Sequence, residues 1–306
     1  MTAPQTNLLL QQSTNLPTAH EIENVPFYPQ EDYFCGPTTL AEMLNFYDRD
    51  IQPETVAPSL FIPERQGSLQ IEMVASIRQY GMLGYAELGN LNQLLSLVSE
   101  DKPVTVLQNQ RLSWYPLWHY ALVIGYDLET ETVILHIGVN ERRIVAMELF
   151  ENTWRKGAYW MLAALPPEEG SDHFDPFLYV SAARDLIEVG QEQAGITALE
   201  TASNQWSDYW LSYFLLGNHF LQINPQDALN WFKRGAQAGS NETSYLNNYA
   251  YALLFNDCAP QALEIIQRAT LLDPDNDGLK DSLAEIRRNQ SGPQAELNNQ
   301  RAACSI

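Results

Sequence analysis

The chain has 306 residues, of which 45% are hydrophobic and 18% charged, a composition typical of a folded protein long enough for two domains. Its formal net charge of −21 argues against nucleic acid and anionic lipid as direct partners, because both would be repelled. The three cysteines, an odd number without metal-type spacing, predict neither a disulfide framework nor a zinc site, and nothing else in the sequence calls for a cofactor.

Residues 1–24 are expected to form a flexible leader. This stretch lacks the basic region and the long apolar run of a signal peptide. The longest apolar runs elsewhere, such as "YALVIGY", are far shorter than the ~18 residues that a membrane helix requires. The sequence therefore predicts no transmembrane segment.

The first helix signal begins at the cysteine in "VPFYPQEDYFCGPTTL", residues 25–40. Pro37 suits the first turn of a helix, and an apolar face with the spacing i, i+3, i+4, i+7 then follows. Its members are Leu40, Met43, Leu44 and Tyr47. This pattern places Cys35 at the N-terminus of a helix.

Helices and strands are then expected to follow in an order typical of an α+β domain. The patterns predict helices over 68–80 and 91–99, and strands over 103–108, 119–126, 132–137, 143–149 and 159–165. The stretch "LPPEEGSD" at 165–172 is rich in proline and acidic residues, so a domain boundary is expected near 167–172.

An internal repeat is expected in the second half. Ala194, Ala228 and Ala262 are spaced by 34 residues, the period of the tetratricopeptide repeat, in which a small residue lets two helices approach closely. We expect an all-α tetratricopeptide-repeat domain over 172–290, with about three repeats and a capping helix over 277–288. The polar residues 291–306 are expected to be a disordered tail.

Cys35 is the candidate nucleophile, because a helix N-terminus and a nearby imidazole are the features that lower a thiol pKa. Of the five histidines, His119 is the best candidate base, since it opens an apolar strand that would fix its position. The adjacent Trp118 is expected to keep water from the site or to contact substrate. The alternatives are that Cys35 is a small buried hydrophobe and that His119 and Trp118 are core residues.

The segment "PQEDYFCGPTTL", followed 84 residues after the cysteine by "HYALVIGYD", resembles the papain-like, bacteriocin-processing (double-glycine) peptidase family. The resemblance covers about residues 25–166 and implies a papain-like α+β cysteine peptidase domain over 25–167. It implies that Cys35 is the nucleophile, His119 the general base and later the general acid, and Gln30 the donor to the oxyanion hole. A side-chain amide near the thiol suits that last role.

The third catalytic residue departs from the family pattern. The family places an Asp or Asn near the position of Ile137, and Asp127 lies about 26 Å along the strand from His119 at ~3.3 Å per residue. A hairpin turning at 127–131 leaves Asn140 as the amide in range. A backbone carbonyl, or a bare pair of Cys35 and His119, is the alternative.

We therefore expect a cysteine peptidase that cleaves peptides or proteins through an acyl-enzyme, with repeats that recruit a substrate or protein partner. The resemblance implies cleavage after small residues such as Gly-Gly. The motifs "PERQGSLQIEM" and "WHYALVIGYD" with the repeats are also similar to bacterial exported, often lipid-anchored proteins, which implies a periplasmic lipoprotein; a cytoplasmic protein is the alternative. A papain-like acyl or peptidyl transferase and an inactive peptide-binding module remain rival functions.

Overall fold

The computed structural model describes residues 3–12, 14–29, 34–61, 67–111, 114–290 and Cys304. The chain forms two compact units, Met1–Gly195 and Ile196–Ile306. Within the described residues, no helix is long and apolar enough to cross a membrane.

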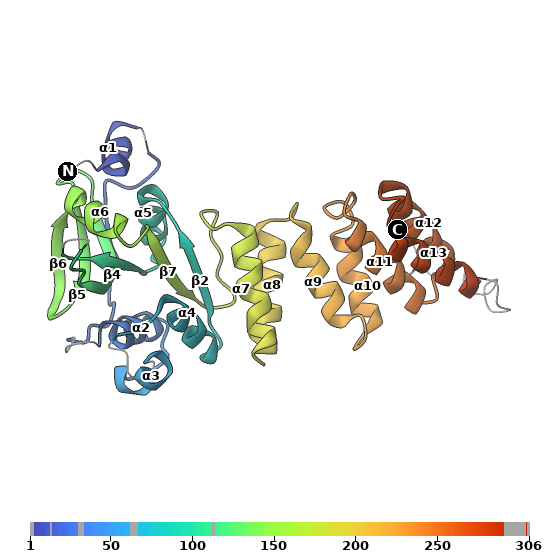
Figure 1. The fold of residues 1–306 in the computed structure, drawn as a ribbon, viewed down its shortest axis with the longest axis horizontal. Helices are drawn as coiled ribbons and strands as arrows, with labels where there is room; N and C mark the ends of the chain where they lie inside the picture. Colours follow the sequence, from blue (N-terminus) through green and yellow to red (C-terminus); the bar gives the residue numbers. More distant parts are fainter. Residues whose placement is uncertain are drawn as a thin grey trace. The chain divides into compact units, whose positions relative to one another are not determined.

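An antiparallel sheet forms the centre of the first unit (Figure 1). Its strands are β1 (Ala19–Glu21), β2 (Leu83–Leu88), β3 (Val104–Asn109), β4 (Trp118–Asp127), β5 (Thr132–Ile137), β6 (Asn140–Ala146) and β7 (Trp160–Leu165). They are ordered β2-β7-β3-β4-β5-β6, and β1 pairs with β4. The predicted α+β class with an antiparallel sheet is confirmed.

Helices cover both faces of this sheet (Figure 1). One face carries α2 (Cys35–Phe46), α3 (Pro53–Leu60) and α4 (Gln70–Gln79), and the other carries α5 (Leu91–Ser99) and α6 (Met147–Arg155); α1 (Pro4–Gln11) lies beside α5 and α6. Leu40 and Leu44 of α2 pack in one buried cluster with Leu122 of β4. The apolar face predicted for the first helix is therefore the one that faces the sheet.

The strand predicted over 143–149 is wrong at its end. The strand stops at Ala146, and α6 begins at Met147, whose backbone N–H donates to the carbonyl of Glu131. Met147, Phe150 and Trp154 are fully buried at i, i+3 and i+7, so the helical period begins inside the apolar run. The sequence does not predict α1, β1, β2 or α3, and α1 and β1 lie within residues 1–24, where a flexible leader is expected.

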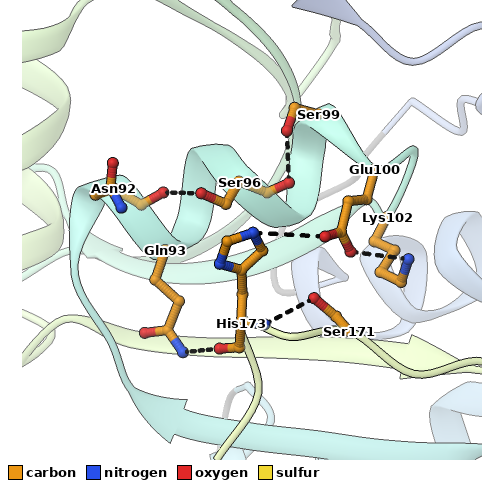
Figure 2. A network of polar contacts seen from close by, with 8 residues as sticks. All are labelled: Asn92, Gln93, Ser96, Ser99, Glu100, Lys102, Ser171 and His173. Atoms are coloured by element: carbon orange, nitrogen blue, oxygen red, sulfur yellow. Dashed lines mark hydrogen bonds and ion pairs between the residues drawn. The ribbon is translucent and has the colours of Figure 1, made fainter. Parts of the chain in front are cut away.

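The segment after β7 is held to the first unit by a polar network (Figure 2). The Glu100 carboxylate lies 3.1 Å from the Lys102 amine and 3.5 Å from the His173 ring, which turns toward it. The Gln93 amide donates to the His173 carbonyl at 2.7 Å. Helix α7 (Pro176–Glu188) follows and packs against β2. The first compact unit consequently extends to Gly195, beyond the boundary expected at 167–172.

Helices account for all the regular structure described after β7. They are α7, α8 (Glu192–Gln205), α9 (Trp210–Phe220), α10 (Pro225–Arg234), α11 (Thr243–Phe255), α12 (Ala259–Leu272) and α13 (Asp277–Gln290). Ala228 in α10 and Ala262 in α12 are fully buried, where α9 packs against α10 and α11 against α12. The 34-residue period therefore corresponds to successive helix pairs, and α13 occupies the position of the predicted last helix.

The prediction that the chain holds no disulfide is wrong. Cys258, at the N-terminus of α12, is bonded to Cys304, 46 residues later. Both cysteines are buried in the core of the second unit. Sequence spacing could not reveal this pair, because helices α12 and α13 separate the two cysteines in the chain. Cys35 is the remaining, free cysteine.

We expect only Cys35 to react with iodoacetamide when the protein is unfolded in denaturant without a reductant, and all three cysteines to react after reduction. Closing a loop of this length is worth about 4 kcal/mol in the chain-entropy model, so Cys304→Ser should also lower the melting temperature. Intact-protein mass spectrometry counts the adducts. Three adducts before reduction would show that the disulfide does not form.

Candidate functional site

Cys35 is the first residue of α2, as the sequence predicted. The following residue, Gly36, lies so close to Ser68 that a Cβ on it would be 2.3 Å from the Ser68 Oγ. No larger residue fits there without a shift of the Ser68 segment. The glycine after the cysteine is thus required by the close approach of the segment before α4 to the N-terminus of α2.

The thiol of Cys35 lies against the backbone of β4. Hydrogen bonds from the backbone N–H groups of Tyr120 and Gly36 favour its thiolate, but burial has the larger effect and raises the pKa of Cys35 above its ordinary value. The helix N-terminus and a nearby imidazole predict a lowered pKa instead. The cost of desolvating the thiolate outweighs them, and it depends on a burial that the sequence does not reveal.

The end of β5 explains why the thiol can reach this backbone. Leu122 of β4 is paired with His136 of β5, and β5 ends one residue later, at Ile137. No residue of β5 therefore lies opposite Tyr120. The edge of β4 is open at that level, and the first turn of α2 lies against it.

His119 is the second residue of β4, directly before Tyr120. Burial lowers its pKa, and the positive charge of Arg143 lowers it further. No hydrogen bond joins the His119 ring to the Cys35 sulfur in the described structure. Because the two pKa shifts both oppose ionisation, the resting pair is a neutral thiol and a neutral imidazole.

The segment that precedes Gln30 is anchored by a buried carboxylate, although Gln30 itself lies outside the described residues. Glu42 of α2 accepts a hydrogen bond from the Tyr28 backbone N–H at 3.1 Å and lies 3.7 Å from the ring of His136. His136 also makes an edge-on contact with Phe27. This role of Glu42 and His136 is not among the sequence predictions; a carboxylate on the buried face of a helix was the available signal.

Asn140 and Trp118 lie at the ends of their strands. Asn140 begins β6, is exposed and pairs with Ile137, so β5 lies between its strand and β4. No hydrogen bond joins Asn140 to His119 among the described residues. Trp118 begins β4 and is 47% exposed, on the face of the strand that carries Tyr120. Trp114 and Tyr115, also exposed, precede it.

The described residues contain no group of three or more His, Cys, Asp or Glu side chains that could hold a metal ion. The groups that this region does present are the Cys35 thiol, the His119 imidazole and the backbone N–H groups near them. Such a set can support nucleophilic attack by sulfur and proton transfer by the ring.

Residues 22–159 match the model of the Peptidase_C39 like family. This region contains strands β2 to β6, together with Cys35 and His119, whereas β1 and β7 lie outside it. The match supports the expectation of a papain-like peptidase domain in the first half of the chain. No curated protein matches the chain.

Several solved structures are similar to the first half of the chain. A protein from Bacillus anthracis described as a C39-like peptidase shares 17% identity with a TM-score of 0.42, over 49% of this chain and 98% of its own. The peptidase domain of Streptococcus ComA shares 17% with a TM-score of 0.40, over 47% and 99%. A double glycine motif protease from an AMS/PCAT transporter, in complex with the leader peptide, shares 18% with a TM-score of 0.37, over 48% and 94%.

In the native protein, the rate at which iodoacetamide alkylates Cys35 should increase as the pH is raised. The midpoint of this increase should lie above about 8.5, the ordinary pKa of a thiol, because burial opposes the thiolate. His119→Ala should leave this midpoint nearly unchanged, since no hydrogen bond joins ring and sulfur. Mass spectrometry at a series of pH values measures the rate. A midpoint below about 7 would instead indicate a preformed thiolate and imidazolium pair.

Replacing Glu42 tests the anchor of the segment before Gln30. Glu42→Leu should lower the free energy of unfolding by about 1–3 kcal/mol, because it leaves the Tyr28 N–H without its acceptor. Glu42→Gln, which keeps an acceptor oxygen, should lose less. Urea unfolding followed by circular dichroism compares the two variants, and equal losses would show that the hydrogen bond to Tyr28 is not what stabilises the segment.

Proposed function

We propose that this chain is a cysteine peptidase that cleaves a peptide bond through an acyl-enzyme, with Cys35 as nucleophile and His119 as base and acid. The observation that carries the proposal is the position of the Cys35 thiol. It lies at the N-terminus of a helix, against the strand that begins with Trp118 and His119, within the region that matches a peptidase family.

The neutral resting pair indicates the order of proton transfers. As the sulfur of Cys35 bonds to the scissile carbonyl carbon, its proton passes to the His119 ring. The oxyanion accepts hydrogen bonds from the Gln30 amide and from a backbone N–H at the start of α2. The carbon–nitrogen bond then breaks, and His119 returns the proton to the leaving amine. Water, deprotonated by His119, hydrolyses the thioester and restores the thiol.

The substrate proposed is a peptide or protein segment with a small residue, such as glycine, on each side of the scissile bond. The support is the resemblance of the segments around Cys35 and His119 to double-glycine peptidases. Trp118 is exposed at the start of β4, on the same face of the strand as Tyr120, and would contact the residues beside the cleaved bond.

The second unit is proposed to recruit the substrate or a protein partner. Helix pairs that repeat at the tetratricopeptide period of about 34 residues build curved stacks with a concave binding face. The second unit, residues 196–306, carries 12 acidic and 7 basic side chains, so a basic segment of the substrate or partner is favoured.

An exported protein, on the periplasmic side of a bacterial membrane as a lipoprotein, is the proposed location. The Cys258–Cys304 disulfide supports an oxidising compartment, where such bonds persist.

An inactive peptide-binding module is the second candidate. The observation that favours it is the raised pKa of Cys35 in a site where no hydrogen bond joins the described thiol and ring. A papain-like transferase would use the same Cys–His chemistry, and product analysis with added amines separates it from a hydrolase.

Cys35→Ala should abolish cleavage of a Gly-Gly-containing peptide, because no other group supplies the sulfur nucleophile. Cys304→Ser is the matched control, a cysteine replacement in the second unit that should keep peptide turnover. Mass spectrometry of the products measures cleavage, and circular dichroism confirms that both variants are folded. Cleavage by Cys35→Ala would refute the peptidase proposal, and no cleavage by the wild type would favour the binding module.

Raising the salt concentration tests recruitment by the acidic helical region. For a Gly-Gly peptide that carries a lysine-rich extension, KM should rise as NaCl increases from about 0.05 M to about 0.5 M, because salt screens charge attraction. The same peptide without the extension is the control, and its KM should change little. Equal salt dependence of the two peptides would remove the support for recruitment by charge.

A further inference from the structure

The strand on the other side of His119 supplies a neighbour that the sequence analysis did not consider. In the ladder of β3 and β4, Gln108 is the direct partner of His119. Residues directly opposite each other in an antiparallel pair project to the same face of the sheet, with Cβ atoms about 5 Å apart. The amide of Gln108 is therefore within reach of the imidazole.

Gln108 is unusual for its position. The residue is only 3% exposed, and no hydrogen bond joins its side chain to another residue within the part of the chain that the structure describes, although its amide atoms are not among the fully buried, unpartnered polar atoms there. Burying an amide without a hydrogen-bonding partner is costly, so a buried glutamine normally has one. The next residue shows the contrast, because the buried Asn109 side chain accepts from two backbone N–H groups, those of Arg111 and Leu117.

The order of groups across the sheet suggests what the Gln108 partner is. The Cys35 sulfur lies at the open edge of β4 beyond the end of β5, His119 lies on β4, and Gln108 lies on β3, on the far side of His119 from the thiol. The thiol, the strand that carries His119 and the strand that carries Gln108 thus follow one another across the sheet, and the side chains of His119 and Gln108 project to the face opposite the one that α2 covers. This is the order in which a nucleophile, its base and a group that orients the base are arranged.

We propose that Gln108 is the positioning residue of His119, an inference that rests on the proposed function. Its side-chain carbonyl accepts a hydrogen bond from one ring N–H and so holds the neutral imidazole in one tautomer, with the unprotonated nitrogen available to Cys35. Gln108 would take the place that the sequence analysis gave to Asn140, whose strand is separated from β4 by β5. Arg143, the charged group that acts on His119 from β6, cannot accept a hydrogen bond and cannot replace it.

Nuclear magnetic resonance of ¹⁵N-labelled histidine tests this directly in the full chain without substrate. The wild-type His119 ring should show one dominant neutral tautomer, and Gln108→Met, which keeps the side-chain length, should show a mixture. Gln108→Glu should raise the pKa of His119 by about 1–3 units through its added charge. An unchanged tautomer in Gln108→Met together with an unchanged pKa in Gln108→Glu would overturn the proposal.

Kinetics with a Gly-Gly peptide give a second readout. Gln108→Met should lower kcat by at least about tenfold with little change in KM, since an unpositioned base loses part of its contribution. Thr105→Val is the matched control, a fully buried polar residue of β3 on the opposite face, and it should keep both kcat and the His119 tautomer. An equal loss of kcat in both variants would mean that Gln108 acts only on strand stability. If Cys35→Ala still cleaves, the proposed function fails, while the resonance data still decide whether Gln108 holds the ring.

Discussion

The close packing of the N-terminus of α2 against the open edge of β4 determines what the rest of the first unit can do. Gly36 allows the Ser68 segment to approach α2, and the apolar face of α2 is buried against the sheet. Because β5 ends at Ile137, the backbone of β4 at Tyr120 is open to the Cys35 sulfur. The thiol is therefore positioned by core packing, which is more rigid than a surface loop.

The same packing sets the protonation state of the site. Burial disfavours a lone charge on either partner, so it raises the pKa of Cys35 and lowers that of His119. In such a site the sulfur is protonated at rest, so the base must already be correctly oriented when the substrate binds. The buried amide of Gln108, opposite His119, could orient the ring in this way, and the exposed amide of Asn140 at the start of β6 would do so less well.

The two units are stabilised by different interactions. In the first, a sheet covered on both faces holds the thiol and the ring, and the polar network around Glu100 and His173 extends that unit through the segment before α7. In the second, helix pairs bury alanines such as Ala228 and Ala262 at their contacts, and a disulfide joins Cys258 to Cys304, 46 residues later. Chemistry and recruitment would thus be assigned to separately stabilised parts of one chain.

Local patterns in the sequence were enough to predict much of this structure. The start of α2 at Cys35, the strand over 132–137, the helix over 91–99 and the helical period of the second half agree with the structure, because each depends on residues close together in the chain. The change from β6 to α6 was missed, since an apolar run of a few residues suits a strand or a helix equally well. The tertiary structure alone decided the Cys258–Cys304 pair, the burial that reverses the expected pKa of Cys35, and the register that places Gln108 opposite His119. These features depend on contacts between distant segments, and such contacts leave no periodic signal in a single sequence.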